Sequence, residues 1–251
     1  MKKIGVFDSG IGGLTVLHAL REACPALDMV FFGDVGRMPY GVHDKETVLG
    51  YSRDCARFLR EQGVEAIVIA CNTATAASLS ELRQELPIPV YGVIEYAASA
   101  AKQATKNGRI GVIATDATVK SGSYAKALAG CTVLERPASP LVTMIEGGIA
   151  DTDGRAFAAC KTALSDLPLQ GIDTLILGCT HFPVYAAPIG QLMPGVTLID
   201  TGRALAETLA DTLGNGGSGQ TAYYTSKKSE AFTDMVHRLD PSAGEIRVVE
   251  W

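Results

Sequence analysis

The chain repeats one pattern twice, and this repeat constrains the fold more than any other feature. Residues 4–9 (IGVFDS) match residues 110–115 (IGVIAT) at an offset of 106, and residues 66–71 (AIVIAC) match residues 174–179 (TLILGC) at an offset of 108. Two motifs in the same order at nearly the same separation indicate two similar units. Buried parallel strands resemble one another because each is a run of Val, Ile and Leu. That resemblance does not account for a cysteine at the same end of both copies.

Short apolar runs alternate with longer segments of helical spacing. We expect strands at 3–8, 28–34, 65–71, 88–94, 109–115, 132–137, 173–179, 196–202 and 221–225, with helices such as 47–62, 73–85 and about 227–239 between or after them, and a loop at 214–220. Strands that alternate with helices predict an α/β fold with a doubly wound, mostly parallel sheet. Together with the repeat, this predicts two similar domains related by pseudo-twofold symmetry, with the active site in the cleft between them.

Composition and charge exclude several classes of protein. The net charge of −5 speaks against a nucleic-acid surface, so no nucleic-acid partner is expected. The N-terminal segment MKKIGVFDSG has too short an apolar run for a signal peptide, and a membrane span needs roughly 20 apolar residues. We therefore expect a cytoplasmic protein with no membrane contact.

The six cysteines are expected to be free thiols in a reducing cytosol. No C-x-x-C pair occurs and no two cysteines have the spacing of zinc ligands. Cys71 and Cys179 stand at equivalent positions of the repeat and are followed by small polar residues. The other four have no such context, and we interpret them as core or surface thiols: Cys24, Cys55, Cys131 and Cys160.

Ligands of open parallel sheets bind beyond the carboxyl ends of the strands. The polar clusters at these ends are Asp8-Ser9-Gly10, Cys71-Asn72-Thr73, Thr115 with Thr118, and Cys179-Thr180-His181. A helix is expected to begin at each cluster, with Asn72 or Thr73 as one N-cap and Thr180 or His181 at the start of another. The N-terminus of a helix attracts carboxylates and lowers the pKa of a thiol. The segment DSGIGG lacks the third glycine of a dinucleotide loop, since position 15 is Thr15. A small anion is therefore favoured over a nucleotide.

Two thiols that face each other across a small ligand suit one kind of chemistry. One thiolate can remove a proton from the Cα of an amino acid while the thiol on the other side returns one, which inverts the centre. Asp8 and His181 each follow a strand and can assist a thiol. The reaction is symmetric because the two thiols exchange roles when the direction is reversed, and this matches the symmetric sequence.

Five segments together resemble the glutamate racemase family: DSGIGGLTV (8–16), GDVGRMPYG (33–41), ACNTATA (70–76), GVIATDATVKSGSYAKAL (111–128) and GCTHFPV (178–184). The resemblance runs from residue 4 to about residue 239. It implies a cofactor-independent racemase that interconverts L- and D-glutamate and supplies D-glutamate for bacterial peptidoglycan. It also implies a homodimer. In each subunit, the first domain comprises 1–94 plus 206–251 and the second domain comprises 95–205.

The resemblance also assigns roles to residues. Cys71 and Cys179 match the catalytic thiols, the first acting on D-glutamate and the second on L-glutamate, and Asp8 and His181 match the groups that support them. Residues matched to substrate binding are Asp8, Ser9, Asn72, Thr73, Thr118, Thr180 and His181, together with Tyr40 and Gly41, whose backbone N–H groups receive the side-chain carboxylate. Glu146 falls where the family carries an acid near the histidine.

Three features depart from the family pattern. The segment 139–148 is one residue shorter than usual, and Tyr96 stands where proline usually follows GVIE. The chain starts directly at its first strand, without the extension that some members use to bind a cell-wall precursor, which argues against activation by that precursor.

Other functions stay open at this stage. Aspartate racemase carries the same two thiols, and one methylene of substrate length is hard to resolve from sequence. Some family members bind DNA gyrase, so a scaffold or inhibitor role is an alternative. A redox or zinc site built from Cys71, Cys179, His181 and Asp8 is another, which metal analysis decides.

Overall fold

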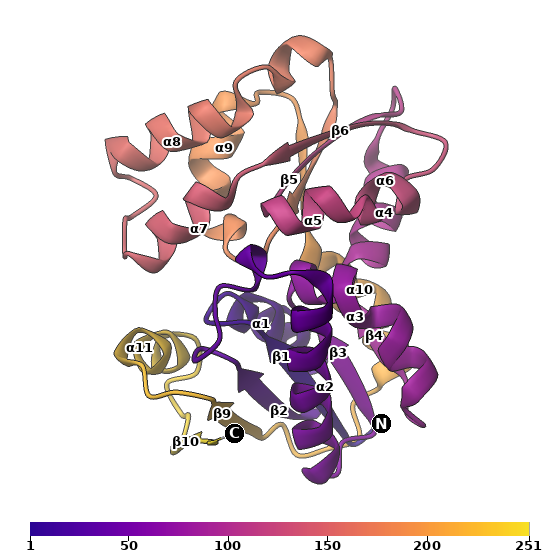
Figure 1. Ribbon diagram of the computed structural model, residues 1–251, viewed down its shortest axis with the longest axis vertical. Helices are drawn as coiled ribbons and strands as arrows, with labels where there is room; N and C mark the ends of the chain where they lie inside the picture. The colour runs from indigo at the N-terminus through magenta and orange to yellow at the C-terminus, as the bar shows by residue number, and fades with distance from the viewer. Residues whose placement is uncertain (251) are drawn as a thin grey trace.

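Two parallel sheets organise the chain, as the repeat predicts. The computed structural model describes residues 1–250, apart from the side chains of residues 168 and 169. In Figure 1 the second sheet and its helices lie above the first, and both chain ends lie in the lower half. The predicted α/β class with two parallel sheets is confirmed.

The first sheet has the strand order β10-β9-β2-β1-β3-β4. Its strands are β1 (Lys3–Asp8), β2 (Asp28–Gly33), β3 (Ala66–Ile69), β4 (Val90–Gly92), β9 (Thr221–Thr225) and β10 (Ile246–Val248). One face packs on α1 (Gly13–Ala23), α10 (Thr201–Leu213) and α11 (Glu230–Leu239), and the other on α2 (Lys45–Glu61) and α3 (Asn72–Glu85). Side chains of β1 alternate between these cores, with Val6 on the first face and Phe7 on the second.

The second sheet has the order β6-β5-β7-β8. Its strands are β5 (Arg109–Ala114), β6 (Thr132–Pro137), β7 (Thr174–Gly178) and β8 (Thr197–Asp200). One face is covered by α7 (Ser139–Glu146), α8 (Gly154–Leu164) and α9 (Ala186–Leu192), and the other by α4 (Val93–Ala104) and α6 (Ser123–Ala127); α5 (Asp116–Ser121) precedes α6. Three 3₁₀ turns complete the description: η1 (Tyr40–Val42), η2 (Leu167–Gln170) and η3 (Phe182–Tyr185).

The internal repeat of the sequence corresponds to equivalent strands of the two sheets. β1 pairs with β3 so that Ile4 lies opposite Ala66, and β5 pairs with β7 so that Ile110 lies opposite Thr174. These are the residues that the offsets relate to each other. The order β2-β1-β3-β4 also equals β6-β5-β7-β8 when each strand is replaced by its counterpart. Cys71 and Cys179 therefore follow equivalent strands.

Several element boundaries differ from the prediction. β3 ends at Ile69 rather than at Cys71, because Cys71 already caps α3. The last helix begins at Glu230, where Ser229 caps it. The short edge strand β10 was missed. The domain boundaries near 94 and 205 stay a prediction, since α4 and α10 each span one of them and pack against each other.

Within residues 1–250, no helix combines the length and the apolar character that a membrane crossing requires.

Candidate active site

A small cavity lies between the two halves of the molecule, at the carboxyl ends of the central strands. Its volume is about 30 Å³. Its lining comprises Ser9, Pro39, Tyr40, Gly41, Cys71, Asn72, Thr73, Thr115, Val142, Glu146, Cys179, Thr180 and His181. The lining contains ten of the twelve residues to which the family resemblance assigns a role. The other two, Asp8 and Thr118, are fully buried directly behind it.

Cys71 follows β3 and caps α3 with its own side chain. The backbone N–H of Ala74 donates to the Cys71 sulfur at 3.4 Å, so the cap is the cysteine rather than Asn72 or Thr73. The thiol donates to the Ser9 hydroxyl at 3.6 Å. Burial, and then the charge of Asp8, raise the pKa of the Cys71 thiol to about 12. The N–H group of Ala74 at the helix start lowers this pKa, as expected, but desolvation outweighs it, so the net shift is upward.

Asp8 ends β1 and holds the loop that leads into α1. Its Oδ2 accepts backbone N–H groups from Gly10 at 3.0 Å and Gly13 at 2.9 Å. Thr180, from the other half of the molecule, donates its hydroxyl to Oδ1 at 3.5 Å. Burial raises the pKa of Asp8, and the nearby His181 and the two N–H donors oppose that rise without cancelling it. A carboxyl group in this setting takes up a proton more readily than one in water.

Cys179, His181 and Glu146 form a chain of contacts in the second half. The Cys179 sulfur lies 3.6 Å from Nδ1 of His181. Nε2 of His181 lies 3.2 Å from Oε1 of Glu146 without hydrogen-bond alignment, so this contact is an ion pair. Burial alone lowers the pKa of His181, but the contacts with Cys179 and Glu146 and the charge of Asp8 raise it to about 10. The imidazole is therefore a cation at neutral pH.

The segment after Cys179 is a 3₁₀ turn, η3, rather than the α-helix start that was expected. His181 precedes the turn, and Pro183 lies in its first residues. The α-helix that follows, α9, begins only at Ala186. The electrostatic partner of Cys179 is therefore the imidazole of His181, whereas Cys71 has a helix N-terminus.

Three threonine hydroxyls join the two halves beside the cavity. Thr73 lies 2.9 Å from Thr115 and 3.3 Å from Thr118, and the latter two lie 2.9 Å apart. Thr115 caps α5 and lines the cavity, whereas Thr118 is fully buried behind it. The resemblance implied Thr118 as a substrate contact. Its hydroxyl is instead linked to the cavity by hydrogen bonds to Thr73 and Thr115, which line it.

Asn72 contacts two residues that are distant from it in sequence. Its Oδ1 accepts the Tyr124 hydroxyl at 2.6 Å, and its Nδ2 donates to Thr201 at 3.4 Å. Sequence reasoning did not identify Tyr124, because nothing in the local pattern of α6 indicates that it contacts α3. It also missed the lining residues Pro39 and Val142, which bring apolar surface and no distinctive chemistry.

Tyr40 and Gly41 line the cavity from η1. The Tyr40 side chain is buried, and its hydroxyl bonds to Asp34 away from the cavity. A Cβ on Gly41 would lie 3.2 Å from Cβ of Thr115, so the backbone of this loop closes against the second half. The loop therefore offers backbone rather than side-chain polar groups to a ligand.

Among the residues that the structure describes, the lining contains neither lysine nor arginine, and His181 is its one basic side chain. A ligand with two carboxylates would depend on N–H groups, hydroxyls and the Asn72 amide. Within residues 1–250, no three His, Cys, Asp or Glu side chains are arranged to hold a metal ion. Two thiols from the two halves, each with its own partner, can remove a proton from a carbon acid and return one to it.

Comparisons with known proteins agree on one family. Residues 4–209 match the family described as Asp/Glu/Hydantoin racemase. A glutamate racemase of Aquifex aeolicus is 45% identical over 93% of this chain and 92% of its own length. The crystal structure of the glutamate racemase isoform RacE1 from Bacillus anthracis is 34% identical, covers 99% of this chain and 97% of its own, and superposes with a TM-score of 0.93. The Francisella tularensis glutamate racemase, solved in complex with D-glutamate, is 32% identical over 99% of this chain and 97% of its own, with a TM-score of 0.89.

Proposed function

This chain belongs to the Asp/Glu/hydantoin racemase family, and on that basis we propose that it interconverts L- and D-glutamate by moving the Cα proton between Cys71 and Cys179. It is an amino-acid racemase and hence an isomerase. One observation carries the proposed mechanism: cysteines that follow equivalent strands of the two sheets line the same small cavity, and each has its own polar partners.

In the proposed reaction the two thiols have complementary roles. Cys179 as thiolate takes the proton from L-glutamate while Cys71 as thiol gives one to the opposite side, and the reverse direction exchanges these roles. The raised pKa of Cys71 favours its thiol form at rest. The protonated His181 can donate Nδ1–H toward a charged Cys179 at 3.6 Å. Neither step requires an electron carrier or a carbonyl cofactor, so we propose that the reaction is cofactor-independent.

The substrate's charged groups are assigned to the polar lining. We assign the ammonium and α-carboxylate to Ser9, Asn72, Thr73 and Thr180, and the side-chain carboxylate to the backbone of Tyr40 and Gly41. Support comes from the lining itself, which offers hydroxyls, an amide and backbone groups but no lysine or arginine. Asp8 and Glu146 support Cys71 and His181 from behind and beside the cavity.

Binding of glutamate requires the two halves to separate. A cavity of about 30 Å³ has the volume that one water occupies in the liquid. A larger pocket of about 580 Å³ lies outside it, and Gly41 and Thr73 line both. We propose that substrate enters from this outer pocket when the seam between Gly41 and Thr115 opens.

The decisive experiment is racemisation of L-glutamate in deuterated water by pure protein without added cofactor. We expect deuterium at Cα of the D-glutamate formed and unchanged activity after chelation. Cys71→Ala and Cys179→Ala should each abolish racemisation, while Cys160→Ala, a buried thiol elsewhere, should keep it. Substantial racemisation by either of the first two variants would disprove the two-thiol mechanism. Aspartate turned over faster than glutamate would overturn the proposed substrate.

The cellular role follows from the product. We propose that the protein supplies D-glutamate for peptidoglycan in the cytoplasm and acts as a homodimer. Expression in a bacterial strain that requires D-glutamate should restore growth, and the Cys71→Ala variant should not. Sedimentation of the pure protein measures the oligomeric state.

A further inference from the structure

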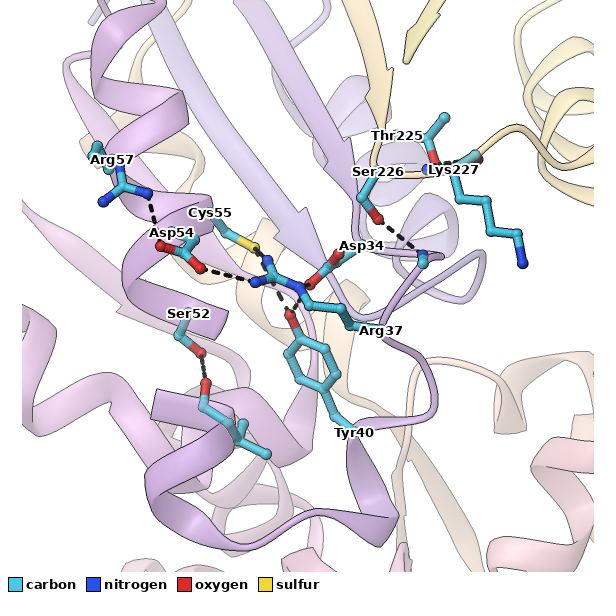
Figure 2. A network of polar contacts seen from close by, with 12 residues as sticks. Asp34, Arg37, Tyr40, Ser52, Asp54, Cys55, Arg57, Thr225, Ser226 and Lys227 are labelled. Atoms are coloured by element: carbon cyan, nitrogen blue, oxygen red, sulfur yellow. Dashed lines mark hydrogen bonds and ion pairs between the residues drawn. The ribbon is translucent and has the colours of Figure 1, made fainter. Parts of the chain in front are cut away.

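A buried polar cluster lies directly behind the loop that lines the cavity. We call it the loop clamp: Asp34, Arg37, Tyr40, Asp54 and Cys55, shown in Figure 2. Asp34 and Arg37 belong to the segment between β2 and η1, Tyr40 begins η1, and the last two belong to α2. The chemistry above uses the backbone of Tyr40 but assigns no role to the side chain of any of the five.

The contacts of the clamp converge on one carboxylate oxygen. The Tyr40 hydroxyl donates to Oδ2 of Asp34 at 2.5 Å, and Nε of Arg37 donates to the same oxygen at 2.6 Å. Arg37 also donates to Oδ2 of Asp54 at 2.8 Å, and its guanidinium lies 4.4 Å from the ring centre of Tyr51. Two carboxylates therefore share the positive charge of Arg37.

Asp34 is fully buried, and its other oxygen, Oδ1, has no hydrogen-bond partner within residues 1–250. A buried carboxylate with one oxygen unpaired is costly, and its remaining contacts become correspondingly important. Burial and the neighbouring Cys55 and Asp34 raise the pKa of Tyr40, so the phenol stays protonated and remains a donor. The Tyr40 hydroxyl is thus a lasting donor of the clamp.

The clamp holds the loop to the first half of the molecule. Besides Arg37 and Tyr40, the backbone N–H of Gly36 donates to the Ser226 hydroxyl at 2.8 Å. Ser226 lies beside Asp34 and Arg37 in Figure 2. On the opposite side, the backbone of residues 39–41 lines the cavity. Anchoring the side chains in this way fixes the backbone of Tyr40 and Gly41, whose N–H groups we assign to the ligand.

We propose that Asp34, Arg37 and Tyr40 are positioning residues that fix the 39–41 backbone as the receptor for the side-chain carboxylate of the substrate. This inference rests on the proposed glutamate racemase function and adds that the clamp sets substrate affinity. The thiols and their partners lie elsewhere in the cavity, so the rate of proton transfer after binding should depend little on the clamp. A KM effect without a kcat effect is the signature.

The test compares two Tyr→Phe variants. Tyr40→Phe removes the bond to Asp34, and Tyr223→Phe removes a bond of the same kind, from its hydroxyl to Asp240 at 2.9 Å, far from the cavity lining. We expect Tyr40→Phe to raise KM about tenfold, the factor that corresponds to one bond to a charged group, with kcat within about twofold. Tyr223→Phe should lower thermal stability while leaving KM unchanged.

Arg37 supplies a second series. Arg37→Lys keeps the charge and one donor to Asp34, so its KM should lie between that of wild type and that of Arg37→Met. Calorimetric titration with racemic glutamate measures binding in the same variants without net reaction, and the dissociation constant should follow KM. An unchanged KM in Tyr40→Phe, or equal losses of kcat and kcat/KM, would overturn the proposal. Wild-type protein that binds glutamate without racemising it would refute the proposed function alone, because the titration still tests the clamp.

Discussion

Replacing Gly12 by alanine tests the geometry of the site with a single carbon atom. Gly12 precedes α1 with φ −60° and ψ −34°, a conformation that alanine adopts without strain. A Cβ there would lie 2.4 Å from Oγ1 of Thr180 and 2.7 Å from Nδ1 of His181, where ordinary contact begins at 3.4 Å. The neighbours must therefore shift by about 1 Å, and both are buried. The shift moves the imidazole nitrogen that contacts Cys179.

The expected cost is large in activity and moderate in stability. A misplacement of about 1 Å can lower a rate about 100-fold, and overpacking a buried site costs about 1–3 kcal/mol. Gly50→Ala is the matched control, because a Cβ at Gly50 in α2 meets nothing within 4 Å. It should leave activity unchanged and stabilise the helix by about 0.5–1 kcal/mol.

The assay measures kcat/KM in both directions, together with the thermal midpoint. Because L- and D-glutamate have equal free energy, kcat/KM must fall by the same factor in both directions. A folded Gly12→Ala protein with kcat/KM within about threefold of wild type would refute the claim that the His181–Cys179 geometry matters for the rate.

Three further predictions address charge and the contact between the halves. The pKa of His181 rises from 6.5 to about 10 on folding. The protonated imidazole therefore stabilises the fold fully below about pH 6.5, and this contribution is lost as pH rises through about 10. Between these pH values, the thermal midpoint of wild type should fall more steeply than that of His181→Gln. Tyr124→Phe removes the 2.6 Å bond to Asn72 and should cost about 1 kcal/mol in urea unfolding and lower kcat/KM. Lys120 lines the outer pocket and forms no ion pair within residues 1–250. Lys120→Met should lower kcat/KM a few-fold at low salt and make kcat/KM less dependent on salt. Lys102 is also exposed but does not line this pocket, so Lys102→Met should leave kcat/KM and its salt dependence unchanged.

The fold could be predicted in outline because buried parallel strands leave a clear trace in sequence. Each central strand is a short apolar run, and the repeat identifies which strand of one sheet corresponds to which strand of the other. The strand β10 left no such trace, since its residues are mostly exposed and include a charged Arg247. This exposed edge strand forms because it pairs with β9, and its own composition does not indicate a strand.

The candidate site was predictable where chemistry and position coincide in the chain. Cys71 and Cys179 stand out through the repeat, and Glu146 only through the resemblance to a family. Tyr124 bonds to Asn72, 52 positions away in sequence, and Arg37 bonds to Asp54, 17 positions away. No local sequence pattern indicates these two contacts. The same applies to each interaction that depends on how the two halves meet.

The structure adds an electrostatic asymmetry that the repeat conceals. The two cysteines are equivalent by strand position, yet burial and then Asp8 raise the pKa of Cys71, whereas the cationic His181 stands beside Cys179. An enzyme that interconverts substrates of equal free energy has no need of equal groups, because each must act as base in one direction and as acid in the other. What it needs is a proton acceptor on one side of Cα and a proton donor on the other. The two cysteines differ in their polar partners although they follow equivalent strands. The repeated backbone places one cysteine on each side of the substrate's Cα in the proposed reaction.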